Sequence, residues 1–277
     1  MRLALPDLIA SDGLAAFPLQ PWTRTKLLLI DGYLGIFTVG MRRQWRLVYA
    51  DLFAGPGLCV DEDTGEERPG SSLMAARHAE FDAVFLNDVS PDAVAALKER
   101  VGGEHSGRVR IAEMDCNDAA TAARKHLFTP ADERSTLGLA VIDPTAFQIS
   151  FDAIRQMTSE LRIDLIITFM TGYIRRFIGE AALESALDRF FGTDAWRNLI
   201  PGRSPERLTY RALLDLYEDQ LRSIGYTVFD DRQQARNRAG ASIYHMVYAS
   251  KHERGGDFWE KISQRDHVGR VRLPGFD

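Results

Sequence analysis

Four aspartates of this sequence each end a short apolar run, and a carboxylate at such a place can bind a ligand. They are Asp51, Asp88, Asp115 and Asp143. A carboxylate accepts hydrogen bonds from both hydroxyls of a ribose or from an ammonium group. We interpret Asp88 as the ribose acceptor, because Ser90 already supplies a cap for the helix that follows it. We interpret Asp51 as the partner of an ammonium group.

A glycine turn comes directly after the first of these runs, in the segment Phe53-Ala54-Gly55-Pro56-Gly57. Glycine lets the backbone turn sharply and approach a ligand closely. The third glycine of a dinucleotide fingerprint is missing, because Val60 stands in its place. We therefore predict that Phe53, Gly55 and Gly57 border a cofactor other than NAD. The alternative is an ordinary turn between a strand and a loop.

The third run ends in Asp115-Cys116-Asn117. An acid next to an amide could hydrogen-bond to the edge of an adenine, so we place Asp115 and Cys116 among the cofactor-binding residues. We expect the Cys116 thiol to be a small packed side chain and not a nucleophile. The alternative is that Asn117 or Asp118 simply caps the next helix.

The fourth run ends in Asp143-Pro144, which resembles the Asp/Asn-Pro-Pro-aromatic loop of amino-group methyltransferases. In that loop the acid and a neighbouring carbonyl hold the target amine. This sequence departs from the pattern, with Thr145 for the second proline and Ala146 for the aromatic residue, while Phe147 comes one position late. We predict that Asp143 and Pro144 face the methyl acceptor. The alternative is a strand terminator that holds a buried acid.

The elements that position these residues alternate between strand and helix. We expect strands over 47–53, 83–88, 109–115, 137–143, 163–170, 226–230 and 242–250. Strands that are apolar on both faces and alternate with helices predict a mostly parallel α/β sheet. About eleven residues without a helical period separate the last two strands, which favours an antiparallel hairpin. The predicted fold is therefore a seven-stranded, Rossmann-like methyltransferase sheet, in which ligands bind outside the carboxyl ends of the strands.

The predicted helices include one over 21–44 and one over 173–191. We expect a single domain over 1–277, with 21–44 as an N-terminal helix and 193–224 as a helical insertion. Two cysteines form no disulfide framework and suit a reducing cytoplasm. No apolar run is long enough to cross a membrane, and no histidine or cysteine spacing predicts a metal site.

Together the four strand ends, in this order, indicate a site for S-adenosylmethionine. The sequence also resembles the three-Cys-motif partner proteins of bacteria, over roughly residues 21–265. The segments that carry the resemblance are Trp22-Thr23-x-x-Lys26-Leu27, Leu47-Val48-Tyr49-x-Asp51-Leu52-Phe53-Ala54-Gly55-Pro56-Gly57, Gly70-Ser71-Ser72, Asp115-Cys116-Asn117, Asp143-Pro144, Ile163-Asp164-Leu165 and Tyr248-Ala249-Ser250-Lys251-His252. The resemblance implies a class I methyltransferase fold and, as partner, a radical-SAM-like protein with a three-cysteine motif.

Three functions follow from these observations. The first is a methyltransferase that acts on an amino group of a nucleic acid or a protein. The second is a non-catalytic partner of the three-cysteine protein in mobile-element or phage-related biology. The third is a metal-dependent nucleic-acid enzyme that uses Asp51, Asp115 and Asp143. Although the net charge is −5, a local arginine rim could still bind a nucleic acid. Its candidate members are Arg42, Arg43, Arg46, Arg175, Arg176, Arg232, Arg236 and Arg238.

Overall fold

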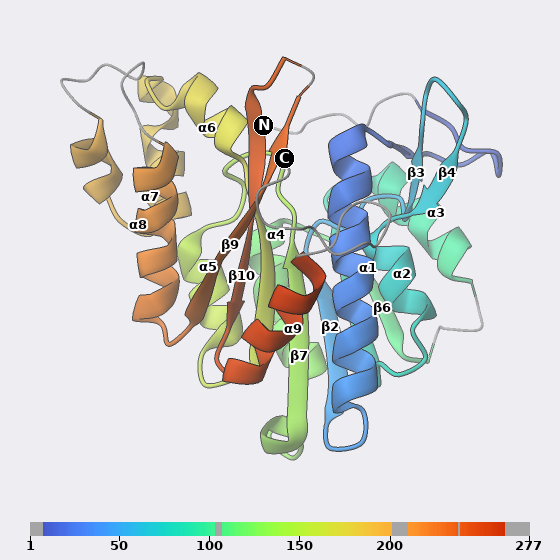
Figure 1. Cartoon of the computed structure of the whole chain (residues 1–277). Helices are drawn as coiled ribbons and strands as arrows, with labels where there is room; N and C mark the ends of the chain where they lie inside the picture. Colours follow the sequence, from blue (N-terminus) through green and yellow to red (C-terminus); the bar gives the residue numbers. More distant parts are fainter. Residues whose placement is uncertain (1–7, 103–106, 201–209, 238, 264–277) are drawn as a thin grey trace.

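A computed structural model of the chain describes residues 8–102, 107–200, 210–237 and 239–263. Its centre is a seven-stranded sheet in the order β6-β5-β2-β7-β8-β10-β9 (Figure 1). The strands are β2 (Arg46–Asp51), β5 (Ala83–Asp88), β6 (Val109–Glu113), β7 (Thr136–Ile142), β8 (Ile163–Phe169), β9 (Thr227–Arg236) and β10 (Ser242–Ser250). Of these seven strands, β10 alone runs in the opposite direction to the others. The predicted α/β fold with a terminal antiparallel hairpin is therefore confirmed.

Helices cover both faces of this sheet, because residues that alternate along each strand point to opposite sides. Val48 and Ala50 of β2 pack on one side, and Leu47 and Tyr49 pack on the other. The first side is covered by α4 (Cys116–Leu127), α5 (Phe151–Thr158), α7 (Glu184–Phe191) and α8 (Tyr210–Ser223). The second side is covered by α1 (Pro21–Met41), α2 (Ser71–Arg77), α3 (Pro91–Val101) and α9 (Glu253–Ser263) (Figure 1).

The strand order reverses between β2 and β7. From β2 the chain continues outward to β5 and β6, whereas β7 is followed by β8 on the other side. In open α/β sheets, ligands bind in the crevice at such a switch point, outside the carboxyl ends of the strands. Asp51 ends β2, and Asp143 comes directly after β7. Two of the four aspartates, Asp51 and Asp143, therefore lie on the two sides of the switch point.

A second, three-stranded sheet lies beside the carboxyl end of β2 and was not predicted from the sequence. It consists of β1 (Phe17–Pro18), β3 (Leu58–Val60) and β4 (Glu67–Pro69), in the order β1-β3-β4. Its strands are only two or three residues long, too short for a periodic pattern to show in the sequence. This sheet joins the segment before α1 to the loop that follows the glycine turn.

Several predicted boundaries are wrong. The first helix ends at Met41 and not at residue 44, and the sixth strand continues to Arg236 because it pairs along the hairpin with β10. The predicted helix 173–191 is three pieces: α6 (Thr171–Phe177), the 3-10 turn η3 (Ala181–Leu183) and α7. The break falls at Gly179. Glycine loses more backbone entropy than any other residue when it is fixed in a helix, so a helix is less stable there.

In the predicted insertion 193–224 the structure describes the 3-10 helix η4 (Ala195–Leu199) and α8, while 201–209 lie outside the described residues. A further 3-10 turn, η2 (Glu133–Ser135), precedes β7. Within the described part of the chain, no helix combines the length and the apolar character that a membrane span needs.

Candidate functional site at the carboxyl edge of the sheet

Asp51 lies at the end of β2 with its carboxylate inside the protein. The residue is fully buried, and its oxygens accept hydrogen bonds from Phe53 N at 3.1 Å and from Ser71 Oγ at 2.7 Å. The Tyr49 hydroxyl donates a third, at 3.3 Å. Burial raises the pKa of Asp51 to about 7 because it disfavours the charged form, although these donors oppose the shift; the nearby carboxylate of Asp143 raises the pKa further. Asp51 therefore titrates near neutral pH.

The backbone conformation and the close packing of the glycine turn both require glycine at two positions. Gly55 and Gly57 have φ angles of +57° and +85°, a backbone region that favours glycine. A side chain at Gly55 would meet the ring of Phe17, since a Cβ there would lie 2.8 Å from its Cε2. A Cβ at Gly57 would lie equally close, 2.8 Å, to Leu97 Cδ1. The chain itself thus requires both glycines.

Asp88 ties the glycine turn to the start of α3. Its Oδ2 accepts a hydrogen bond from Gly55 N at 2.9 Å, and its Oδ1 accepts one from Ser90 N at 2.9 Å. Ser90 caps α3 as expected, with its Oγ accepting from Ala93 N. Burial raises the pKa of the Asp88 carboxyl above its ordinary value, and the N–H donors oppose this shift. The residue is half-buried, so it lies at the surface of the turn.

Asp115 itself caps α4, so the alternative that Asn117 or Asp118 supplies this cap is wrong. Its Oδ1 accepts from the backbone N of Asn117 at 2.9 Å and from the Asn117 amide at 2.8 Å. The same amide donates to the carbonyl of Gln148 at 3.0 Å. Asp115 is exposed. The Cys116 thiol is buried, which raises its pKa to about 12 and leaves it a packed side chain.

Asp143 forms an ion pair with Lys26, a residue of α1 to which the sequence analysis gave no role. The Lys26 ammonium also lies 5.3 Å from the centre of the Tyr244 ring on β10. The Tyr244 hydroxyl donates to the carbonyl of Trp22, 2.6 Å away. Lys26 appeared in the sequence only within a motif that carried the resemblance. Its place opposite Asp143 depends on how α1 crosses the sheet, which no local pattern specifies.

The edge as a whole brings together acceptors that suit an adenosine. The Asp143 carboxylate lies close enough to raise the pKa of Asp51, and Gly55 is bonded to Asp88. Asp115 follows the neighbouring strand β6. Exposed or half-buried carboxylates accept from ribose hydroxyls and from an exocyclic amine, so the donor and acceptor set fits such a ligand.

The metal-cluster hypothesis gains no support from the structure. Among the residues that are described, no group of three or more His, Cys, Asp or Glu side chains is placed to hold a metal ion. Asp51 is turned into the protein, where it bonds to Ser71, and Asp143 is paired with a lysine.

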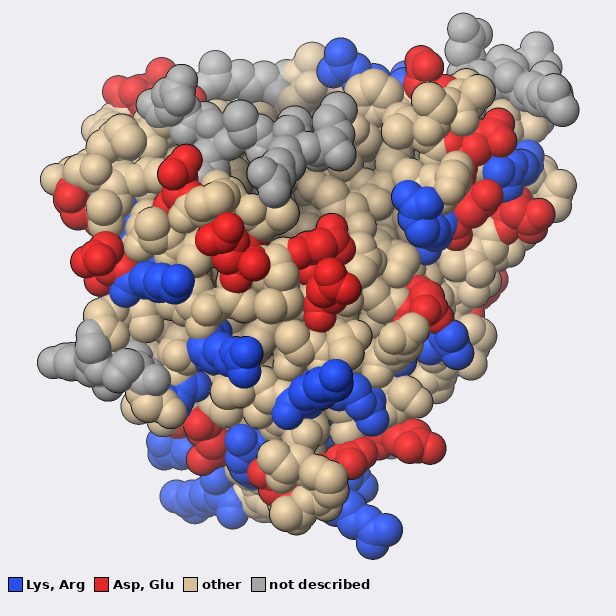
Figure 2. All heavy atoms as spheres, turned by 180° about the vertical axis from the view of Figure 1, so that it is seen from behind, with Lys and Arg blue, Asp and Glu red and all other residues tan. Residues whose placement is uncertain are grey.

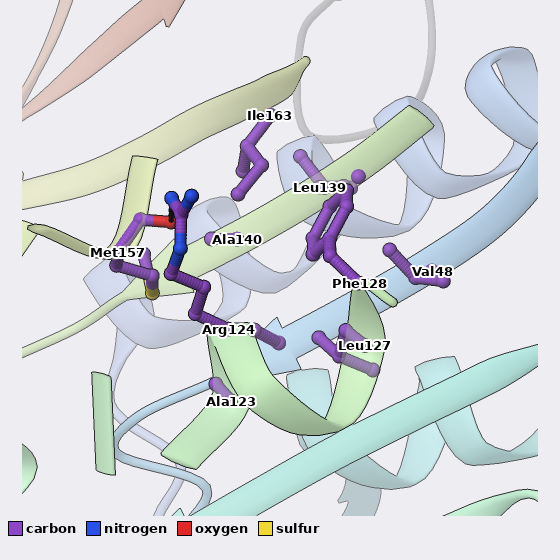
Figure 3. Close-up of a pocket in the computed structure, with 11 residues that line it drawn as sticks. Val48, Ala123, Arg124, Leu127, Phe128, Leu139, Ala140, Met157 and Ile163 are labelled. Atoms are coloured by element: carbon purple, nitrogen blue, oxygen red, sulfur yellow. Dashed lines mark hydrogen bonds between the residues drawn. The ribbon is translucent and has the colours of Figure 1, made fainter. Parts of the chain in front are cut away.

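A small cavity lies under α4, away from this edge (Figure 3). Its volume is about 10 Å³, at the lower limit for a single water molecule. The lining is almost entirely apolar, and it includes Val48, Ala123, Leu127, Ala140 and Met157. We interpret it as a packing void between the sheet and the helices.

The predicted arginine rim is wrong as one continuous surface. Arg42, Arg43 and Arg46 lie where β2 begins, and Arg46 donates to the carbonyl of Leu127 at 2.8 Å. Arg175 and Arg176 come after the carboxyl end of β8, a strand that is parallel to β2. A parallel sheet puts these two groups at opposite edges. Arg236 ends β9, and Arg238 lies outside the described residues.

On the rear face of the molecule, basic side chains gather towards the lower end, where β2 and β7 begin. Acidic side chains predominate towards the upper end (Figure 2). This face therefore presents most of its positive charge away from the carboxyl edge. A nucleic acid held at the candidate site would gain little from it.

Solved structures share this architecture. Protein LPL1258 from Legionella pneumophila is 12% identical, with a TM-score of 0.52 over 84% of this chain and 86% of that one. Trm1 from Pyrococcus horikoshii, solved with S-adenosyl-L-methionine, is 14% identical, with a TM-score of 0.50 over 92% of this chain. The fold is that of the class I methyltransferases. The present chain spans only 62% of the Trm1 chain.

At these identities the likeness to class I methyltransferases concerns the fold alone. No family model matches the sequence, and no curated protein matches it. The resemblance to the three-Cys-motif partner proteins therefore stays a prediction.

Proposed function

We propose that this chain is a methyltransferase that binds S-adenosylmethionine at the carboxyl edge of its sheet. The observation that supports this most is the position of the polar strand ends within the strand order. Asp51 and Asp143 flank the switch point between β2 and β7, and Asp88 and Asp115 follow the next two strands outward. A class I methyltransferase fold with acceptors at these places suits an adenosine-containing cofactor.

In this proposal each strand end has its own role, and Asp51 lies near the ammonium group of the cofactor. Asp88 accepts from the ribose hydroxyls, and Asp115 with Asn117 bonds to the adenine edge. Phe53, Gly55 and Gly57 border the cofactor, and Cys116 packs behind the adenine. The cofactor supplies an activated methyl group, and the protein contributes mainly the positioning of the acceptor in line with it. We also propose that residues 1–277 act as a single domain in the cytoplasm.

The role of Asp88 can be tested by calorimetric titration with S-adenosylhomocysteine. Asp88→Asn keeps the shape but removes the charge and one acceptor. It should weaken binding by about 1.5–3 kcal/mol, because hydrogen bonds to a charged group are lost. Asp118→Asn, an exposed change in the first turn of α4, should leave the affinity unchanged. A wild-type chain that gives neither heat nor thermal stabilisation with millimolar ligand would overturn the proposed function.

For the acceptor, we propose an amino group on a nucleic acid or a protein, with Asp143 and Pro144 beside it. One observation favours the alternative of a non-catalytic partner of a three-cysteine-motif protein. The Asp143 carboxylate is already engaged by Lys26, a cation of the same chain. Methyl-labelled cofactor, offered with RNA, DNA and protein from the same cell, separates the two. Binding without transfer to any of them would favour the non-catalytic partner.

A further inference from the structure

Lys26 lies at the switch point of the sheet although its helix comes before the first central strand. It reaches Asp143, which follows β7, from α1 on one face of the sheet. The side chains of Lys26 and Asp143 are 14% and 24% exposed. Both are therefore partly open to solvent at the place where the topology predicts a ligand.

The charges at this place are unequal. Asp51 and Asp143 provide two carboxyl groups, and within the described part of the chain the hydrogen-bond donors to Asp51 are all neutral: Phe53 N, Ser71 and Tyr49. Lys26 provides the ammonium that pairs with Asp143, and the face of the Tyr244 ring favours the same positive charge. The switch point thus presents the Lys26 ammonium beside the Asp143 carboxylate, and the buried carboxyl group of Asp51 lies nearby.

We propose that Lys26 and Asp143 together receive the α-amino acid group of the cofactor. Lys26 takes the ligand carboxylate, and Asp143 takes the ligand ammonium. The proposal rests on the proposed function and changes two of its roles. Asp143 contacts the cofactor and not the methyl acceptor, and it replaces the fully buried Asp51 as the partner of the ligand ammonium. Each protein charge exchanges one opposite charge for another, so neither is left unpaired when the ligand enters. A ligand with only one of the two charges would leave one protein group without compensation.

The test compares two ligands that differ in this group alone. S-adenosylhomocysteine carries the amino acid group, whereas 5′-methylthioadenosine keeps the adenosine and lacks it. Both are titrated into the wild-type chain, Lys26→Met and Asp143→Asn, after thermal melts have shown which variants fold. Arg24→Met is the matched control, because it also removes a cation of α1 but one that pairs with Asp61 and Glu66, each at 2.7 Å.

We expect Lys26→Met to weaken S-adenosylhomocysteine about tenfold to hundredfold, the range for a lost charge-assisted hydrogen bond. The affinity for 5′-methylthioadenosine should stay the same. Asp143→Asn should show the same selectivity and replaces Lys26→Met if that variant does not fold. Arg24→Met should change neither affinity.

Two results would overturn the inference and leave the proposed function standing. In one, Lys26→Met and Asp143→Asn weaken both ligands by the same factor, which indicates a structural role. In the other, the wild-type chain binds the two ligands equally well. If the wild-type chain binds neither ligand, the proposed function fails together with this inference.

Discussion

Among single residues, Asp51 makes the clearest prediction about pH. Its pKa is about 7 in the folded chain, against about 4 for an ordinary aspartate. Between these two values the folded state keeps a proton that the unfolded state has already released. The contribution of Asp51 to the stability of the folded state is therefore complete below about pH 4 and is lost as the pH rises through about 7. Between pH 5 and pH 8 the free energy of unfolding should fall by about 2–3 kcal/mol on its account.

The variant Asp51→Asn should lose this dependence, since an amide does not titrate. Urea unfolding at pH 5 and pH 8 measures it, with Asp118→Asn as the exposed control that keeps the wild-type slope. An unchanged slope in Asp51→Asn would show that another group carries the effect.

At the same scale, the sequence predicted which residues lie at the carboxyl edge of the sheet, but it did not predict which residues contact each other there. The runs that end in Asp51, Asp88 and Asp143 were visible because apolar strands leave a clear boundary at a charged residue. The pairing of Asp143 with Lys26 was not visible, because it joins residues 117 positions apart. The cap at Asp115 was missed because its acid could equally well face a ligand, and only backbone geometry separates the two roles.

At the scale of elements, the glycines of α1 make a prediction about packing. A Cβ at Gly40 would lie 3.0 Å from Phe258 of α9, whereas a Cβ at Gly35 would meet nothing within 4 Å. Gly35→Ala should therefore stabilise the chain by about 0.5–1 kcal/mol through its helix propensity. Gly40→Ala should lose that gain, because the Phe258 ring must shift. Chemical denaturation of the two variants gives the comparison, and equal stabilisation by both would contradict the close packing of α1 on α9.

The elements themselves were largely predictable, and their exceptions have physical causes. The central strands are long, apolar and flanked by turns, so their existence was clear from the sequence. The strands β1, β3 and β4 were missed because two or three residues carry no period. The break between α6 and α7 was missed because helical spacing continues across it, and only Gly179 marked the boundary.

At the scale of the whole molecule, Arg100 of α3 holds the segment before α1 against the glycine turn. Its side chain is 5% exposed, and the guanidinium donates to both carboxylate oxygens of Asp12 at 2.8 Å and to the carbonyls of Ala15 and Pro56 at 2.7 Å. Arg100→Met should destabilise the chain by about 2 kcal/mol. It should also make residues 11–17 sensitive to limited proteolysis.

Mass spectrometry of the fragments locates the cuts. Arg68→Met serves as the control, because the Arg68 side chain is 41% exposed and pairs with Glu66 alone among the ion pairs of the described residues. If Arg100→Met resists proteolysis as well as the wild-type chain, other contacts hold this segment in place.

The position of β10 has a consequence for how a cell makes this protein. The ribosome synthesises the chain from its N-terminus, so α1 and β8 leave it well before β10. Until β10 arrives, the nascent sheet ends at β8, whose residues are all buried in the finished molecule. An apolar open edge of this kind invites pairing with other chains. Tyr244 beneath Lys26 also comes from β10, and its partner Trp22 lies 222 residues earlier. The candidate site is therefore completed only after β10 has been synthesised, and a chaperone that shields β8 until then would protect it.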